Sequence, residues 1–239
     1  MAGLGSPRPQ ADCAKPAPAT IRASGALVSH HLDDLCRRLP VLTAIRDQIE
    51  SAHQLLEQCY RAGGTLFLCG NGGSAADCEH WAGELLKGFE CHRPPPAGHG
   101  LPPDLAKLLQ QALPAIPLTG FMGLRSAFAN DVEPKADYAQ LVWGLGRPGD
   151  VLAAISTSGN AVNCCLAAKT AHAKGMKVLS LTGAKGGQLA GLADVAIKAP
   201  ETRTLLVQEL HLPIYHVLCL MLEDAFFRPA SHPPAAVGG

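Results

Sequence analysis

Two glycine- and hydroxyl-rich turns hold the residues of this chain that are best suited to bind an anion. The first reads Cys-Gly-Asn-Gly-Gly-Ser over residues 69–74, between a short apolar run and a helical pattern. The second reads Ile-Ser-Thr-Ser-Gly-Asn over residues 155–160 and also follows an apolar run. Glycine lets the backbone approach a ligand closely, and the free N–H groups of a helix start favour negative charge. The two turns together predict one ligand held between them, with a phosphate group as its anchor.

Both turns also have a purely structural explanation. Ser74 stands where a helix N-cap would, and Asp77 follows it at the spacing of a capping box. The hydroxyls of residues 156–158 could cap the next helix in the same way. Three consecutive hydroxyls exceed what one cap needs, so we favour contact with an oxyanion.

Four further polar residues have spacings that could gather them around one pocket. His80 and Glu84 are four residues apart and share one face of a helix. Such a pair, taken alone, is more often a solvated contact than a metal site. Gln208 and His216 lie in the last helical segment, eight residues and about 80° of rotation apart, so both can border the same pocket. His211 lies about 140° around from His216 and does not join them easily.

Strand-like and helix-like segments alternate and must position these residues. Short apolar segments ending in turns alternate with segments of helical spacing, which predicts an α/β fold with a doubly wound parallel sheet and right-handed crossovers. Ligands of such sheets bind at the carboxyl ends of the strands, where both turns fall. The predicted strands cover 65–69, 115–118, 150–155, 177–182 and 195–199, and the predicted helices cover 27–39, 42–62, 74–87, 105–113, 137–145, 161–174 and 203–227.

The composition excludes several classes of function. Lys plus Arg and Asp plus Glu both number 20, so no net charge attracts nucleic acid or acidic membranes. No apolar run approaches the ~18 residues of a membrane span, so we expect no contact with membranes. The nine cysteines show no metal-binding spacing. Their odd number, without a signal peptide, indicates a reducing cytoplasm.

The ends of the chain differ from its middle. Residues 1–24 are rich in Pro, Ala, Gly and Ser without periodicity, which predicts a disordered arm. The Pro-rich residues 228–239 predict a disordered tail. We expect residues 25–227 to form a single domain, with the Pro- and Gly-rich residues 93–103 as a surface loop.

Five short segments occur along the chain in this order: 69–74, His80-Trp81-Ala82-Gly83-Glu84, Asn130-Asp131, 155–160, and Gln208-Glu209-Leu210-His211 with His216. Together they resemble the sugar-isomerase (SIS) domain family, and within it the phosphoheptose isomerases. The resemblance extends from about residue 27 to residue 227 and implies a flavodoxin-like sandwich with flanking N- and C-terminal helices. It implies an aldose–ketose isomerase that converts D-sedoheptulose 7-phosphate into D-glycero-D-manno-heptose 7-phosphate.

The resemblance also implies roles for individual residues. It implies one zinc ion per subunit, bound by His80, Glu84, Gln208 and His216, which are donors that suit four-coordinate zinc. Isomerisation through an enediolate needs a carboxylate base and an acid, for which Glu84 and His216 are the best candidates. Whether Glu84 acts mainly as a ligand or as a base stays open. The implied substrate contacts are Asn71, Gly72, Gly73, Ser74, Glu84, Asn130, Asp131, Ser156, Thr157, Ser158 and Gln208.

Two residues depart from the family pattern. Ala161 stands where the family usually has a further serine, and Leu205 stands where phosphoheptose isomerases often have an aspartate. An isomerase of another phosphosugar therefore remains an alternative. A non-catalytic SIS protein that binds a partner or regulates is a second alternative, although such members lack a complete Glu and His pair.

The predicted last helix, residues 203–227, indicates how subunits could assemble. It is apolar on more of its surface than one packing face requires, which predicts burial on several sides. We expect part of it to form a subunit interface. The resemblance implies a homotetramer with active sites at subunit boundaries.

Overall fold

The structure, a computed structural model, describes residues 24–228. The predicted disordered arm and tail lie outside the described residues, apart from the border residues 24 and 228, and stay predictions.

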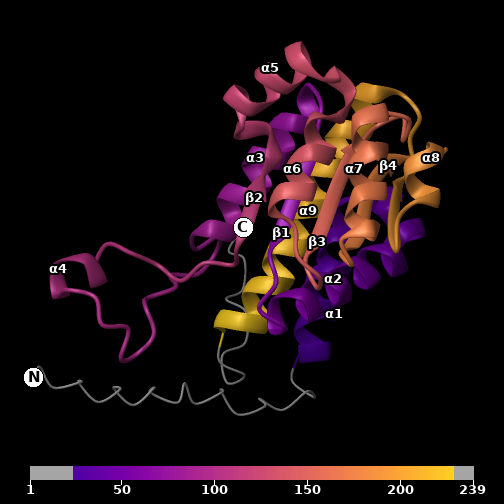
Figure 1. The fold of residues 1–239 in the computed structure, drawn as a ribbon. Helices are drawn as coiled ribbons and strands as arrows, with labels where there is room; N and C mark the ends of the chain where they lie inside the picture. The colour runs from indigo at the N-terminus through magenta and orange to yellow at the C-terminus, as the bar shows by residue number, and fades with distance from the viewer. Residues whose placement is uncertain (1–23, 229–239) are drawn as a thin grey trace, which may run out of the picture.

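All the described strands belong to one parallel sheet, as predicted (Figure 1). The sheet order is β2-β1-β3-β4-β5. The chain adds β2 on one side of β1 and the later strands on the other side, so the order of strand addition reverses between β1 and β3. Such a reversal creates a ligand-binding crevice at the carboxyl ends of these two strands. The strands are β1 (Leu66–Gly70), β2 (Ala115–Pro117), β3 (Val151–Ser156), β4 (Lys177–Gly183) and β5 (Val195–Ala199).

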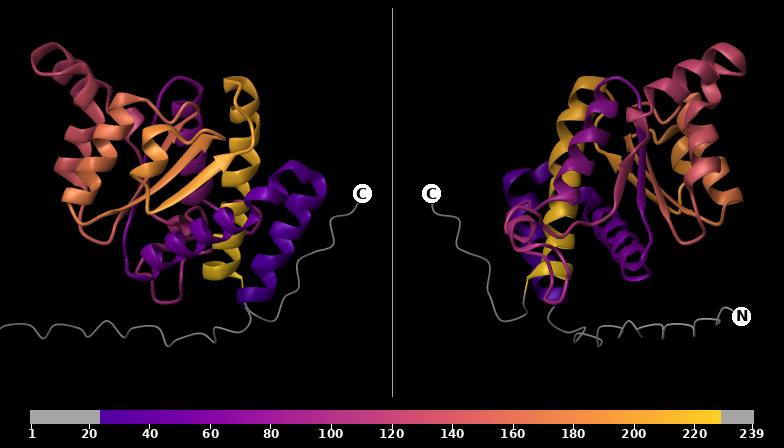
Figure 2. Two further views of the ribbon diagram at one scale, coloured as in Figure 1. Left: turned by 90° about the vertical axis from the view of Figure 1, so that its right-hand side faces the viewer. Right: turned by 60° about the vertical axis from the view of Figure 1, so that its left-hand side comes forward.

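Helices cover both faces of the sheet because its strands are apolar on both sides. In β1, Leu66 and Leu68 pack into one hydrophobic cluster while Phe67 and Cys69 pack into the other. The first face carries α1 (Ser24–Arg38), the 3-10 helix η1 (Pro40–Ile45), α2 (Arg46–Arg61), α3 (Gly73–Leu86) and α9 (Thr204–Phe227). The second face carries α6 (Asp137–Leu145), α7 (Val162–Ala173) and α8 (Gly187–Gly191) (Figures 1 and 2). The remaining helices are α4 (Pro103–Ala106), α5 (Met122–Asp131), η2 (Leu118–Gly120) and η3 (Pro134–Ala136).

Helix α9 packs into the core of its own chain, and its expected part in a subunit interface stays a prediction. It packs against α1, α2 and α3 as well as against β4 and β5. Its 24 residues are long and apolar enough to cross a membrane by length and composition alone. Eleven of its residues are nevertheless buried within this chain. Contacts inside the chain therefore account for much of its apolar surface, while Leu205 and Leu212 remain exposed.

Two segments differ from the predicted elements. The predicted helix over 105–113 is wrong, since the helix there ends at Ala106. Leu105, Leu108 and Leu109 are exposed, so no packed face stabilises a longer helix. Helix α5 was not predicted, and Asn130 and Asp131 lie at its end. It has no buried residue, so the sequence there lacks an apolar stripe.

A buried ion pair fastens the segment that follows α3 to the far half of α9. The Glu223 carboxylate accepts hydrogen bonds from the backbone N–H groups of Phe89, Glu90 and Cys91, at 2.8–3.1 Å. Arg93 donates from Nε to the same carboxylate at 2.8 Å, and both side chains are fully buried. Arg93 also donates to the carbonyl of Leu85, at the end of α3. Phe89 is thereby held on α9, beside the candidate site.

We expect Glu223→Gln to lower the free energy of unfolding by about 3–5 kcal/mol, because it leaves the buried guanidinium of Arg93 without its charged partner. Urea denaturation measures this change. Glu57→Gln is the control, since it removes a pair with the exposed Arg61 and should cost less than about 1 kcal/mol. Equal losses in the two variants would contradict this interpretation of the buried pair.

Candidate active site

The two glycine- and hydroxyl-rich turns meet at the carboxyl edge of the sheet. They join the start of α9 around a pocket of about 340 Å³. Seven of the predicted substrate contacts lie in its wall. The lining residues are Asn71, Gly72, Gly73, Ser74, Ile155, Ser156, Thr157, Ala161, Thr204 and Gln208.

Three helix starts border this pocket, and none is capped by its own N-cap side chain. Helix α3 has Gly72 as its N-cap, α7 has Ala161, and α9 has Arg203. Ser74 therefore lies within the first turn of α3 and is not the N-cap that its spacing suggests. Free N–H groups at a helix start carry partial positive charge. The pocket is accordingly suited to a phosphate.

The geometry of the first turn depends on its glycines. Gly72 has φ +56°, a left-handed conformation that side chains disfavour. A Cβ on Gly73 would lie 2.5 Å from Nε2 of Gln208. Gly73 therefore allows the Gln208 amide to approach the backbone of the turn.

Hydrogen bonds to neighbouring elements hold the turns of the pocket in place. Asn71 and Asn163 exchange two hydrogen bonds of 2.9 Å, which tie the first turn to α7. The Gly183 N–H donates to the carbonyl of Thr157 at 3.0 Å, which fixes the second turn on the end of β4. The hydroxyl of Tyr138 donates to the carbonyl of Gly70 at 2.5 Å. Sequence reasoning missed Asn163 and Tyr138, because neither lies in a turn with a recognisable motif.

Four predicted substrate contacts lie apart from this wall, and one of them, Glu84, belongs to the group of polar side chains between α3 and α9. Ser158 is exposed, and its Oγ accepts a hydrogen bond from the Asn160 N–H within the turn. Asn130 and Asp131 lie at the exposed end of α5, where Asn130 donates to Asp131 at 2.8 Å. Their roles in substrate binding stay predictions.

A second group of polar side chains lies between α3 and α9. His80 Nε2 is 3.1 Å from Glu84 Oε1, and the rings of His80 and His216 are 5.0 Å apart between centroids. Phe89 packs against the ring of His216 at 5.2 Å. The Nε2 atom of His216 is buried and has no hydrogen-bond partner. His80, Glu84 and His216 therefore come together as predicted, with one nitrogen free for a ligand.

The surroundings set the protonation of this group. Burial raises the pKa of Glu84, but the hydrogen bond and charge of Lys87 and the charge of His80 outweigh it, so the pKa is lowered overall. Burial, followed by the charge of His80, lowers the pKa of His216. At neutral pH the site therefore presents a carboxylate beside an uncharged imidazole, as a base and a proton carrier require.

The donor types of this group fit zinc. Imidazole nitrogens and carboxylate oxygens are its usual ligands, and the buried Nε2 of His216 lacks any other partner. Gln208, in contrast, directs its amide toward Gly73. The described part of the chain contains no group of three His, Cys, Asp or Glu side chains already arranged around one metal position. The donors are close to one another without forming a completed site.

The pocket and the polar group lie at a fixed separation along the same two helices. Gly73 and His80 are seven residues apart on α3, which corresponds to about 10 Å along the helix axis. Gln208 and His216 are eight residues apart on α9, or about 12 Å. A ligand that extends along α3 and α9 can therefore place an anion at one end and its reacting atoms at the other.

Comparisons with known proteins identify the family. The sequence pattern of the SIS domain matches residues 31–183. The phosphoheptose isomerase of Shewanella denitrificans is 36% identical over 193 residues, which cover 80% of this chain and 90% of that protein. The structure of the phosphoheptose isomerase GmhA from Neisseria gonorrhoeae is similar with a TM-score of 0.66 and 31% identity, covering 84% of this chain and 98% of that chain. A phosphoheptose isomerase from Francisella tularensis matches with a TM-score of 0.68, 30% identity and the same coverage. This chain therefore belongs to the SIS domain family, and within it to the phosphoheptose isomerases.

Proposed function

We propose that this protein converts D-sedoheptulose 7-phosphate into D-glycero-D-manno-heptose 7-phosphate through an enediol. The observation that carries the proposal is the arrangement along α3 and α9, with an anion pocket at one end and Glu84 beside His216 further along. An extended seven-carbon sugar phosphate spans a comparable distance from its phosphate to its first two carbons. Relatives that match most of the chain are named phosphoheptose isomerases.

The reaction moves two protons between neighbouring atoms of the sugar. Glu84 removes the proton from C1 of the ketose while an acid protonates the oxygen on C2, which gives an enediol. Glu84 then returns its proton to C2, and the hydroxyl on C1 loses its proton as the aldehyde forms. His216 carries the oxygen-bound protons through Nε2, which has no hydrogen-bond partner in the protein. One lone pair cannot bind zinc and a proton at once, so binding zinc and carrying protons are alternative states of this nitrogen. Atoms and charge balance without any outside reactant.

The proposed metal is zinc, one ion per subunit, held by His80, Glu84 and His216, with Gln208 joining if its amide turns from Gly73. When bound, zinc supplies positive charge that stabilises the developing oxyanion. The 3.1 Å contact of His80 with Glu84 and the unpartnered His216 Nε2 support this assignment.

A related isomerase that acts on another phosphosugar is the second candidate. Ala161 lines the pocket, so the wall has no hydroxyl at this position. Leu205, next to Thr204 in the pocket wall, is 48% exposed. A non-catalytic binding protein is less well supported, because Glu84 and His216 both lie close to His80.

We propose that the protein assembles as a cytoplasmic homotetramer with active sites at subunit boundaries. Large apolar side chains remain exposed in the single chain, among them Met122 at 78%, Leu108 at 75% and Trp143 at 58%. Contact with other copies would cover them. The eight described cysteines are free thiols, which suits a reducing compartment.

We expect turnover to require the phosphate group. Sedoheptulose without its phosphate should react with kcat/KM lower by at least about 10²-fold, because the helix starts around the pocket then bind no charge. Added inorganic phosphate should inhibit turnover of the phosphorylated sugar competitively. Equal kcat/KM values for the two sugars would contradict the assignment of the pocket.

A further inference from the structure

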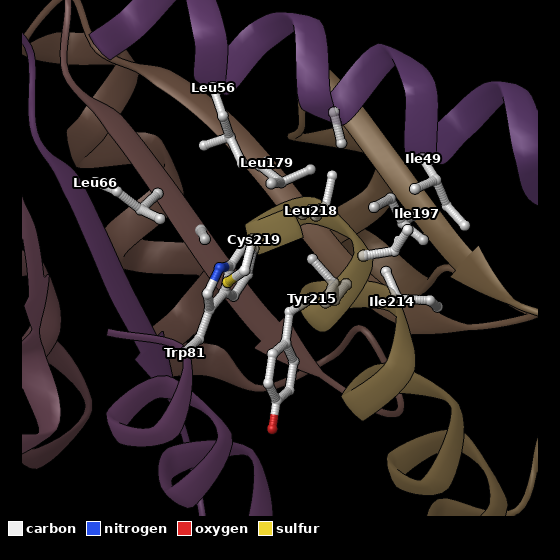
Figure 3. Close-up of a cluster of buried hydrophobic side chains, with 14 of the residues drawn as sticks. Ile49, Leu56, Leu66, Trp81, Leu179, Ile197, Ile214, Tyr215, Leu218 and Cys219 are labelled. Atoms are coloured by element: carbon white, nitrogen blue, oxygen red, sulfur yellow. The ribbon is translucent and has the colours of Figure 1, made fainter. Parts of the chain in front are cut away.

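Tyr215 connects the hydrophobic core to the candidate active site. Its ring is fully buried and stacks on Trp81 of α3, with centroids 5.6 Å apart and an interplanar angle of 16°. Figure 3 shows the two rings among the core side chains, with the Tyr215 hydroxyl directed away from the cluster. The stack fixes the ring, and thereby the position of its oxygen.

The hydroxyl of Tyr215 meets two polar groups of α3. Its oxygen is 2.9 Å from Nδ1 of His80 and 3.4 Å from Oδ1 of Asp77. An ionised carboxylate can only accept a hydrogen bond, and a hydroxyl has one proton to donate. With that proton directed to Asp77, the oxygen accepts from an N–H at Nδ1 of His80. The three groups then form a directed chain from His80 through Tyr215 to Asp77.

The other nitrogen of His80 faces the candidate site. Nε2 lies 3.1 Å from Oε1 of Glu84, and the ring of His216 is 5.0 Å from that of His80. When the proton of the neutral ring is on Nδ1, Nε2 presents its lone pair beside the Glu84 carboxylate. These two groups repel each other unless a cation or proton lies between them. This is the tautomer in which a histidine binds a metal through Nε2.

We propose that Tyr215 and Asp77 are positioning residues that hold the His80 ring with its proton on Nδ1, so that Nε2 serves as a metal ligand beside Glu84. The inference rests on the proposed zinc site and adds two residues that do not themselves touch the metal. The Trp81 stack alone would need no hydroxyl, because phenylalanine fills the same space. A buried hydroxyl costs free energy unless it is hydrogen-bonded. The two groups that the Tyr215 hydroxyl contacts, His80 and Asp77, both lie on α3.

The test is the zinc affinity of Tyr215→Phe, measured on the metal-free full chain by competition with a chromophoric chelator. We expect the affinity to fall by about 10- to 100-fold, the usual effect of losing a partner of a metal-binding histidine. Tyr60→Phe is the matched control, since the Tyr60 hydroxyl is buried in the same core without a hydrogen-bond partner. It should leave the zinc affinity unchanged.

Nitrogen NMR of the His80 ring gives a readout that a purely structural role would not change. In the zinc-free protein, at a pH where the ring is neutral, Glu84 favours the proton on Nε2 and the Tyr215 oxygen favours it on Nδ1, so the fraction of rings with the proton on Nδ1 should be higher in the wild type than in Tyr215→Phe. Unchanged zinc affinity in Tyr215→Phe, a wild type that binds no zinc, or an equal fraction of Nδ1-protonated rings in the two proteins would each overturn the proposal. None of these measurements needs a sugar, so failure of the proposed isomerase activity would be recognised separately.

Discussion

Glu84→Gln should lower kcat for sedoheptulose 7-phosphate by about 10²- to 10⁴-fold, the range expected for loss of a general base. The amide has the shape of the carboxylate, but it cannot take a proton from carbon. The wild-type carboxylate is kept ionised chiefly by Lys87, which donates to it at 2.7 Å. Steady-state assays at saturating zinc separate the loss of the base from any loss of metal.

Glu57→Gln is the control for this variant, because Glu57 pairs with Arg61 on α2, outside the site. It should retain the wild-type kcat. Circular dichroism and thermal unfolding must show that Glu84→Gln is folded. A folded, zinc-saturated Glu84→Gln variant with wild-type kcat would exclude Glu84 as the base.

His216→Asn should also lower kcat by about 10²- to 10⁴-fold, because it removes the group that carries protons between the sugar oxygens. Burial and the nearby His80 lower the pKa of His216 from the ordinary value of 6.5, so the wild-type ring is neutral at pH 7. Protonation should therefore reduce wild-type kcat/KM only below about pH 6.5. The measurement is kcat/KM against pH for the wild type and the variant.

His172→Asn is the matched control, since His172 lies on the second face of the sheet, away from the site, and its Nε2 donates a hydrogen bond to the Leu192 carbonyl. It should keep both the rate and the pH profile of the wild type. If His216→Asn kept the wild-type kcat, or if the wild-type rate were halved well above pH 6.5, the proposed role of His216 would be wrong.

The fold was predictable because its strands are buried on both faces. Such strands read as short continuous apolar runs, and β3 is buried at every residue. The pocket followed from the same pattern, since both turns come directly after buried strands. Helix α5 has no buried residue, so apolar periodicity could not reveal it.

The details of the site depend on contacts between segments that are far apart in the sequence. Spacing placed His80 with Glu84 on one helix, but only the packing of α3 on α9 brings His216 to His80. No sequence pattern singles out Tyr215, and its hydroxyl gains a role only through the groups it meets on α3. The buried pair of Arg93 and Glu223 joins residues 130 positions apart, beyond the reach of any local pattern.

The most direct test of the central claim is to incubate the wild-type protein with sedoheptulose 7-phosphate and zinc and to identify the products by NMR. We predict that the manno-heptose 7-phosphate accumulates to a constant ratio with the ketose, and that the same ratio is reached from the aldose side. The claim would be contradicted if the folded protein, supplied with zinc, left both sugars unchanged. If a different ketose phosphate were converted in parallel samples, the same site would be assigned to that sugar. If none of the sugar phosphates tested were converted, the proposed isomerase activity would be rejected.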